Sequence, residues 1–200
     1  MKQLEGADGV PAEALPAEIL HTESLPAEIL LSDVRIRPYA IDDGDRLRRM
    51  SGGLSRKSLY TRFFSGTPRI PEAYVTALRM LDHWDREAMV ALLDGEMIGV
   101  AEYIRDRHRP WRAELAVLIA DPWQRRGLAR RLVTCLAPLA ERRGITGFDA
   151  EVILENRDAM VAIRHGWPAA RPGSQDGAAH YSLPLPLPTP AVPAPARALG

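Results

Sequence analysis

The sequence has little cysteine, no long apolar run and no excess of charge of either sign. A single cysteine, Cys135, occurs in the 200 residues, which excludes intramolecular disulfide bonds and cysteine-based zinc sites. The five histidines are scattered without the spacing of metal ligands, so no metal is expected. No run approaches the roughly 18 apolar residues that cross a membrane, and the first ten residues lack an apolar signal core. These absences predict a soluble cytoplasmic protein with neither a membrane nor a metal as partner.

Acidic and basic residues balance at 26 each, and the formal net charge is +0. A neutral chain does not attract nucleic acid or other polyanions through its overall charge, so no nucleic-acid partner is expected. A local cluster of cations is still compatible with this balance. The function must therefore be sought in local patterns.

The two ends differ in composition from the middle of the chain. The hexapeptide LPAEIL occurs at Leu15–Leu20 and again at Leu25–Leu30, and two copies of this length cannot form a solenoid. The last residues alternate leucine or alanine with proline, which cannot continue a sheet because proline lacks the ladder donor. We expect a flexible leader at 1–31, one folded domain at 32–184 and a disordered, proline-rich tail at 185–200.

Between the ends, apolar runs of strand type alternate with helical patterns. Asp94-Gly95 joins two apolar runs and is a strong signal for a hairpin, and Ser55 is placed to cap a helix. The predicted order is a strand, two or three helices, three strands, a helix, a strand, a helix and a final strand. The fold class is α+β, with a mixed, mostly antiparallel sheet of about six to seven strands flanked by helices.

The stretch DPWQRRGLARRL, which begins at Asp121, is the most informative segment. It follows the predicted strand AELAVLIA and places a glycine at the start of a helix, where free N–H groups and the helix dipole favour an anion. Gly127 allows a ligand to approach the backbone, and guanidinium groups suit phosphate oxygens. Arg125, Arg126 and Arg130 are the best placed of the arginines. The same pattern is also compatible with an ordinary basic helix start.

Gln124–Ala129 resembles the pattern Gln/Arg-x-x-Gly-x-Gly/Ala, with which the GNAT superfamily of N-acetyltransferases binds the pyrophosphate of coenzyme A. The segments GITGFDAEVILENRDAMVAIRHGW and SLYTRFF are similar to segments of bacterial members, including some protein-lysine acetyltransferases. The resemblance covers about Val34 to Leu183 and implies a sheet that splays open after its fourth strand. It also implies acetyl-CoA as co-substrate and a primary amine as acceptor, on a small molecule or a protein lysine. A homodimer is compatible with it.

The resemblance also assigns roles to individual residues. Main-chain groups of the fourth strand would bind the pantetheine arm, the loop would bind the pyrophosphate, and an asparagine would help to position the cofactor. The cofactor-binding residues implied in this way are Val117, Leu118, Ile119, Gln124, Arg125, Arg126, Gly127, Leu128, Ala129, Arg130 and Asn156.

Transfer to an amine needs a base, because a lysine-like amine with a pKa of about 10.4 must lose a proton before it attacks. Glu114 lies on the fourth strand among apolar neighbours, at a position similar to the glutamate base of some family members, and it is the predicted catalytic residue. The alternative is an ion pair with Arg112 or Arg105. Glu102 and Glu151 are weaker candidates for the base.

The sequence departs from the family pattern at the general acid. Many relatives carry a tyrosine seven residues after the asparagine, and here Ile163 stands at that position. Tyr103 and Tyr181 are alternative proton donors, and Cys135 is expected in the core rather than as a nucleophile. The leading hypothesis is an N-acetyltransferase that acts by direct attack within a ternary complex. A non-catalytic acyl-CoA-binding or interaction module is the alternative.

Overall fold

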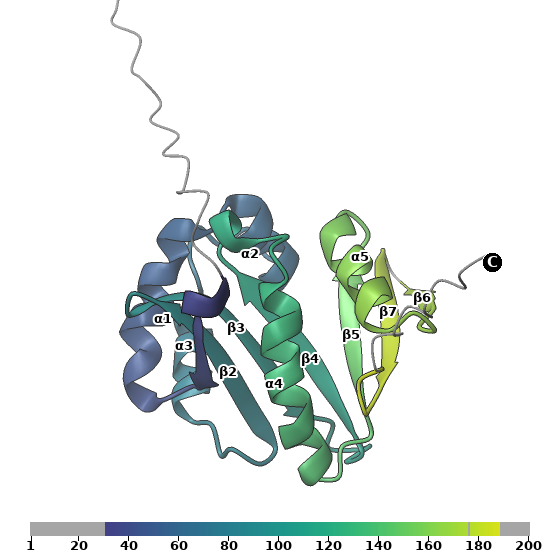
Figure 1. Cartoon of the computed structure of the whole chain (residues 1–200). Coiled ribbons are helices and arrows are strands. Elements are labelled where there is room, and N and C mark those ends of the chain that lie inside the picture. Colours follow the sequence, from purple (N-terminus) through teal and green to yellow (C-terminus); the bar gives the residue numbers. More distant parts are fainter. Residues whose placement is uncertain (1–30, 176, 189–200) are drawn as a thin grey trace, which may run out of the picture.

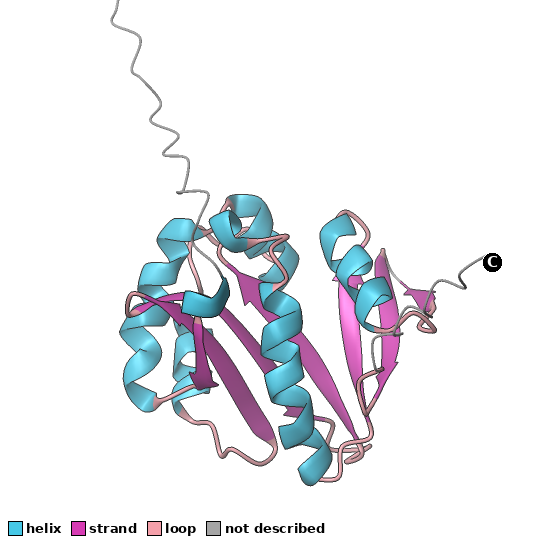
Figure 2. Cartoon of the chain, viewed as in Figure 1, coloured by secondary structure: helices cyan, strands magenta, loops and turns pink. Residues whose placement is uncertain are grey.

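The computed structural model describes residues 31–175 and 177–188 (Figure 1). The repeats of the predicted leader and most of the predicted tail lie outside the described residues. The described chain forms one seven-stranded sheet in the order β1-β2-β3-β4-β5-β7-β6, with α-helices packed against it (Figure 2). The predicted α+β class, with a mixed sheet flanked by helices, is confirmed.

The elements follow the predicted order with one addition, the short strand β6. The strands are β1 (Arg35–Pro38), β2 (Arg86–Leu93), β3 (Glu96–Arg105), β4 (Arg112–Ile119), β5 (Gly147–Ile153), β6 (Pro172–Gln175) and β7 (Ala178–Pro184). The α-helices are α1 (Gly44–Met50), α2 (Arg56–Phe63), α3 (Glu72–Arg79), α4 (Leu128–Arg142) and α5 (Arg157–Gly166). Short 3₁₀ turns lie at Leu31–Asp33, Ile41–Asp43, Ser51–Gly53 and Asp121–Trp123.

Local signals in the sequence account for the ends of several elements. Asp94 and Gly95 have φ angles of 50° and 83° and form the turn between β2 and β3, as their residue types predict. Ser55 caps α2, since its side chain accepts a hydrogen bond from the N–H of Ser58 at 3.2 Å. Pro138 lies inside α4 without ending the helix.

The sheet changes character between β4 and β5. Among the described strands these two are the parallel neighbours, and they pair over only three positions, Arg112↔Gly147, Ala113↔Phe148 and Glu114↔Asp149. Beyond Glu114 the strands diverge, as Figure 1 shows. We call the region from Leu115 to Ile119, where β4 has no pairing with β5, the splay. The predicted opening of the sheet after its fourth strand is confirmed.

The register of β3 and β4 shows which main-chain groups border the splay. Ala120 N–H donates to the carbonyl of Ile98 at 3.0 Å, and hydrogen bonding alternates along an antiparallel pair. The main-chain groups of Leu118 therefore face β3. Those of Val117 and Ile119 face the splay.

The core lies against both faces of the sheet, and α4 contributes a leucine stripe to it. Leu128, Leu132 and Leu136 are at most 1% exposed, and each such side chain contributes about 1.5–3 kcal/mol of hydrophobic stabilisation. Cys135 lies beside this stripe and is exposed, so the expectation that it is buried in the core is wrong. Leu31 and Leu185 pack against the core at the ends of the described chain.

In the described residues no helix is both long and apolar enough to cross a bilayer.

Candidate functional site

The loop between β4 and α4 has the backbone shape that its glycine predicts. After the 3₁₀ turn Asp121–Trp123, Arg125 and Gly127 have positive φ angles of 59° and 83°. Gly127 occupies the N-cap of α4, where its left-handed conformation suits glycine best. A Cβ at this position would have only one heavy atom within 4 Å, the Cδ1 atom of Leu31 at 3.9 Å. The space over Gly127 is therefore open to a ligand.

Free main-chain donors gather at the same point. In the part of the chain that the structure describes, the N–H groups of Leu128, Ala129 and Arg130 donate to no main-chain carbonyl or side chain. The helix dipole adds roughly half a positive charge at this end. Leu128 is 1% exposed, so its contribution to a ligand is its N–H group. This donor set fits a pyrophosphate.

Cations surround these donors without being neutralised. Arg125, Arg126 and Arg130 are exposed, and none of them forms an ion pair within the described residues. Arg126 lies over the ring of Trp123, with its guanidinium carbon 5.3 Å from the ring centroid, which gives it a defined place. Arg131 is different, because its guanidinium donates to the carbonyl of Leu31. Arg131 is therefore engaged with the main chain, whereas the cofactor contacts predicted for Arg125, Arg126 and Arg130 stay predictions.

Gln124 is held from three sides. Its side-chain Nε2 donates to the Oγ of Ser58 at 3.1 Å, to the carbonyl of Ile119 at 3.0 Å and to a carboxylate oxygen of Asp121 at 3.1 Å. Ser58 in turn donates to Asp121 at 2.7 Å. Gln124 thus joins the end of β4, the loop and α2. Its predicted contact with the cofactor stays a prediction, and the structural role of Ser58 and Asp121 was not foreseen.

The predicted pantetheine-binding residues on β4 are not equivalent. Leu118 directs its main-chain groups to β3, and the carbonyl of Ile119 already accepts from Gln124. Val117 borders the splay with its main-chain groups, which makes it the best placed of the three.

Asn156 lies at the N-cap of α5, on the far side of the splay from β4. Its side-chain oxygen accepts a hydrogen bond from the N–H of Ala159 at 3.2 Å. This capping bond accounts for an asparagine at this position. Its predicted role toward the cofactor is an additional one and stays a prediction.

Glu114 is the last residue of β4 that pairs with β5, so it lies where the splay begins. Its side chain is exposed and forms no ion pair with any described residue. Arg112 pairs with Asp149 and Arg105 pairs with Asp85, so neither serves as the alternative ion-pair partner of Glu114. The carboxylate is therefore available to solvent and to a substrate.

Glu114 and α4 lie on opposite faces of the sheet. Gly99 of β3 packs against Leu132 of α4, and Gly99 pairs with Ile119 of β4. Side chains alternate along a strand, so odd-numbered residues of β4 face α4 and Glu114 faces the side of α2. Helix α4 and the carboxylate of Glu114 thus lie on opposite faces of the sheet.

Glu102, a weaker candidate for the base, is fully engaged. Its carboxylate is 1% exposed and accepts from Arg62 of α2 and from Arg86 of β2, each at 2.6 Å. Burial alone would lower the pKa of Arg62, but its neighbours Tyr74 and Glu102 outweigh burial and raise this pKa, and the charge of Glu114 adds to the effect. Both oxygens of this carboxylate are thus occupied by guanidinium groups. Glu102 is therefore a poor base.

Of the two proton donors considered from the sequence, Tyr181 is only 3% exposed and Tyr103 is engaged in a hydrogen bond. Burial raises the pKa of Tyr103, against the opposing effect of Arg143, and its hydroxyl donates to the carbonyl of Trp84 at 3.0 Å. Ile163 is buried in the core. Within the described residues, no cluster of three or more histidine, cysteine or carboxylate side chains could hold a metal ion.

Comparison with known proteins agrees with this arrangement. Residues 56–167 match the family model of the acetyltransferase (GNAT) family. The GNAT domain of PAT from S. lividans is similar over 76% of this chain and 90% of that one, with 30% identity and a TM-score of 0.71. A ribosomal-protein-alanine N-acetyltransferase from Brucella melitensis shares the fold at 17% identity, with a TM-score of 0.61 over 76% of this chain and 99% of that one.

Proposed function

The chain belongs to the GNAT family of acetyltransferases, and we propose that it transfers an acetyl group from acetyl-CoA to a primary amine. The acceptor amine is carried by a small molecule or by a protein lysine. The observation that carries the proposal is the loop at Gly127, where open backbone lies beside the unpaired edge of β4 and where N–H groups and three arginines have no partner among the described residues. A cytoplasmic location and a homodimer stay predictions from the sequence.

The loop residues fit the co-substrate in chemical terms. Bound acetyl-CoA supplies the acetyl group as a thioester that an amine attacks directly. The N–H groups of Leu128–Arg130 and the exposed arginines would hold its pyrophosphate, and the main chain of Val117 would hold its pantetheine arm. The N–H groups and the main chain of Val117 are oriented by α4 and β4 before any ligand arrives, which lowers the entropic cost of binding.

Glu114 is the proposed general base. Its carboxylate is exposed and unpaired among the described residues, whereas those of Glu102 and Asp149 are bonded to arginines. It lies on the face opposite α4, so an acceptor amine reaches it without passing the cofactor loop. This arrangement supports direct attack within a ternary complex.

A non-catalytic acyl-CoA-binding module is the alternative function. The specific observation in its favour is Ile163, a buried apolar residue where many relatives place the tyrosine acid. Water can protonate a departing thiolate, so this observation does not remove the enzymatic proposal. The two functions differ in whether thiol is released from acetyl-CoA when an acceptor is present.

The testing experiment is a thiol-release assay with acetyl-CoA against a panel of small amines and lysine peptides. Turnover with any acceptor supports the enzyme. Binding of acetyl-CoA by calorimetry without turnover on the whole panel would support the module. Absence of binding at micromolar to millimolar concentrations would contradict both.

Glu114→Gln tests the base directly. The variant keeps the size of the side chain but cannot accept the amine proton, so we expect kcat/KM at neutral pH to fall by about 10²- to 10⁴-fold. Affinity for acetyl-CoA should change little, because the loop at Gly127 is untouched. Part of the loss should be recovered at high pH, where more of the amine is already neutral. Unchanged turnover with weakened cofactor binding would assign Glu114 a structural role instead.

A further inference from the structure

The balanced charge of the chain is the sum of an acidic beginning and a basic remainder. Residues 1–30, which we call the acidic segment, contain six carboxylate side chains and one cationic side chain, that of Lys2. Since the whole chain has 26 residues of each sign, the remaining residues contain 25 basic and 20 acidic side chains. The two parts therefore carry opposite net charges and attract each other.

The carboxylates of the acidic segment recur at a fixed interval. Five of them are spaced five residues apart, and each copy of LPAEIL contributes one of these five: Asp8, Glu13, Glu18, Glu23 and Glu28. No lysine or arginine lies between the first and the last of them. The acidic segment is thus a series of anions without counter-charges of its own, which suits it to a cationic surface.

The acidic segment joins the described chain beside the cofactor loop, Gln124–Arg130. The Cδ1 atom of Leu31 lies 3.9 Å from the point where a Cβ would stand on Gly127. The carbonyl of Leu31 accepts a hydrogen bond from the guanidinium of Arg131, in the first turn of α4. In Figure 1 the purple turn Leu31–Asp33 lies beside the first turns of α4. The fold therefore attaches the acidic segment next to the cations of the loop.

The length of chain that precedes Leu31 keeps the nearest carboxylates close to the loop. Three residues separate Glu28 from Leu31, so their Cα atoms lie within about 11 Å of each other, because an extended chain spans at most about 3.6 Å per residue. The corresponding limit for Glu23 is about 29 Å. A tether of this length gives a group an effective concentration in about the millimolar range. Contacts that are individually weak are then sufficient to occupy the loop.

The loop offers a carboxylate the same donors that it offers a pyrophosphate. In the part of the chain that the structure describes, Arg125, Arg126 and Arg130 have no ion-pair partner, and the N–H groups of Leu128–Arg130 have no acceptor. Guanidinium groups form paired hydrogen bonds with carboxylates as well as with phosphates, and the N-terminus of a helix stabilises either anion. Both anions would use the same donors, so only one of them binds at a time.

We propose that the acidic segment binds the arginines of the cofactor loop and competes there with acetyl-CoA. The segment acts as an internal anion that the co-substrate must displace. It thereby raises the concentration of acetyl-CoA that the protein needs for binding. This inference rests on the proposed role of the loop in holding the cofactor, and it involves no contact with Glu114.

The test compares the binding of acetyl-CoA by the full chain with its binding by two full-length variants of equal net charge. The first variant neutralises the acidic segment through Glu13→Gln, Glu18→Gln, Glu23→Gln and Glu28→Gln. The control neutralises four exposed carboxylates elsewhere through Asp42→Asn, Asp45→Asn, Asp94→Asn and Glu141→Gln. Binding is measured by calorimetric titration at about 0.15 M salt, where charges more than about 8 Å apart are largely screened.

The Kd for acetyl-CoA should be about five- to tenfold lower in the first variant than in the wild type. This range corresponds to a segment that occupies the loop for about 80–90% of the time in the wild type. The control should change Kd by less than about twofold, because its four positions act only through screened, long-range charge. An unchanged Kd in the first variant, or an equal decrease in both variants, would overturn the inference.

A second readout needs no co-substrate. Without ligand, the amide NMR signals of Leu128–Arg130 should differ between the wild type and the first variant but coincide in the wild type and the control. Salt at about 1 M, where the Debye length is about 3 Å, should move the wild-type signals towards those of the first variant. Loop signals that are the same in the wild type and the first variant would contradict binding of the segment.

Two further outcomes separate the inference from its neighbours. A difference between the wild type and the first variant that grows with protein concentration would place the contact between two copies of the chain, and the inference would then be wrong. If acetyl-CoA binds to none of the three proteins, the proposed function fails, while the loop signals still decide whether the acidic segment binds there.

Discussion

Gly127 and Gly95 have the same φ angle, so substitutions at these two glycines distinguish an effect on stability from an effect on ligand binding. Gly127 and Gly95 both have a φ of 83°, and both have open space where a Cβ would stand. A side chain at either position costs about 1–2 kcal/mol of backbone strain. Only Gly127 lies at the cluster of free N–H groups. Their substitutions should therefore have equal effects on stability and unequal effects on binding.

Gly127→Val is expected to abolish the thermal stabilisation of the protein by coenzyme A, because the side chain would fill the space over the loop. For the wild type, ligand at about 100 times Kd should add about 2.7 kcal/mol to the free energy of unfolding. Gly95→Val, the control, should lower Tm to a similar extent in the absence of ligand yet keep the full shift with ligand. Both are measured by differential scanning calorimetry. Equal shifts in the two variants would remove Gly127 from the binding site.

Asp43 provides a pH-dependent part of the stability. Burial alone would raise the pKa of Asp43, but the hydrogen bonds from Arg37, from the N–H of Ala40 and from Arg46 outweigh it and lower this pKa. The carboxylate is 0% exposed and lies 2.5 Å from Arg37. A pKa that is lower in the folded than in the unfolded chain gives stability that is present above the unfolded value of about 3.9. That stability is lost as pH falls through the folded value.

Asp43→Asn should lower the free energy of unfolding by about 3 kcal/mol at pH 7, because it leaves the guanidinium of Arg37 without its counter-charge. The difference from the wild type should persist down to about pH 5 and shrink below about pH 4. Asp45→Asn is the matched control, since Asp45 is 79% exposed in its pair with Arg48 and should change stability by less than about 1 kcal/mol. Urea unfolding at a series of pH values measures both. A difference that does not vary with pH would contradict the assignment.

At single positions the sequence predicts the backbone conformation better than it predicts the surroundings of a side chain. The positive φ of Gly127 was predictable, because glycine adopts this conformation without strain. The exposure of Cys135 was not predictable. The sequence defines the buried face of a helix only to within about one residue, until the element that packs against the helix is known. Arg112 was considered as a partner of Glu114 and instead binds Asp149, which lies 37 positions along the chain. Long-range pairs of this kind depend on strand register, which no local pattern shows.

At the scale of elements, α4 contains a feature that works against its own stability. Pro138 lies in the helix interior, where it lacks the N–H that would bond to Thr134, and its ring opposes regular helix geometry. The proline is exposed, so its removal costs no core packing. The leucine stripe on the other side of α4 supplies the burial that keeps the helix intact.

Pro138→Ala should raise the free energy of unfolding by about 1–3 kcal/mol. The helix interior favours alanine over proline by about 3 kcal/mol, and the greater freedom of the unfolded chain offsets part of this. Urea unfolding should show a higher midpoint with an unchanged slope. A lower midpoint would mean that α4 depends on the proline for a local bend that positions the loop.

The elements that the sequence predicts are those with local causes. The hairpin at Asp94-Gly95 and the capped helix after Ser55 follow from turn and cap chemistry. The strand β6 was missed because its segment contains proline and glycine, which have low strand propensity. The segment is a strand because it pairs with β7. The splay was expected only through the resemblance to a family, since periodicity does not show how far two distant strands stay paired.

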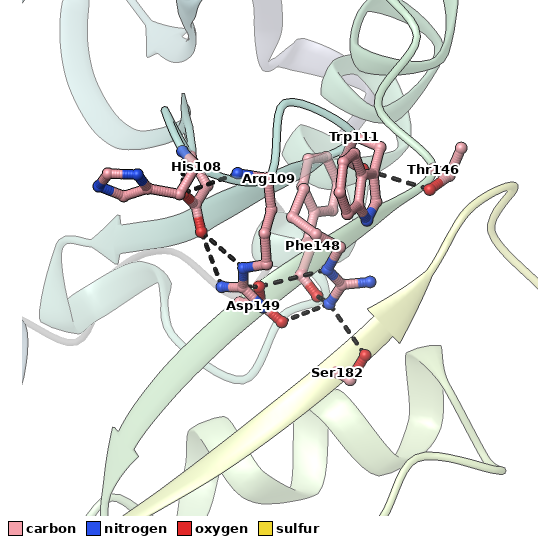
Figure 3. Close-up of polar contacts among 9 residues, drawn as sticks. His108, Arg109, Trp111, Thr146, Phe148, Asp149 and Ser182 are labelled. Carbon is pink, nitrogen blue, oxygen red and sulfur yellow. Dashed lines mark hydrogen bonds and ion pairs between the residues drawn. The ribbon is translucent and has the colours of Figure 1, made fainter.

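At the scale of the whole molecule, the sheet consists of two parts that share a short seam. One part consists of β1 to β4 with α1 to α4, and the other consists of β5 to β7 with α5 (Figure 1). Three residue pairs between β4 and β5 join the two parts. Arg112 reinforces the seam at the same point, because it donates to Asp149 of β5 and to Ser182 of β7, both labelled in Figure 3. Glu114 lies at the closed end of the splay and the loop before α4 follows its open end, so β4 joins the two parts of the candidate site.

The splay also gives this sheet an edge in its interior, and amide hydrogen exchange should reveal it. Val117 turns its N–H toward the splay, whereas Leu118, its neighbour, turns its N–H to β3. Without ligand, the Val117 amide should exchange with deuterium much faster than that of Leu118, as on an outer strand. Coenzyme A bound along β4 should slow Val117 while Leu118 changes little, and NMR-detected exchange measures both. The ratio of the two rates would then report occupancy of the site without any acceptor. Equal slowing of both amides would mean that the ligand tightens the whole sheet instead of filling its internal edge.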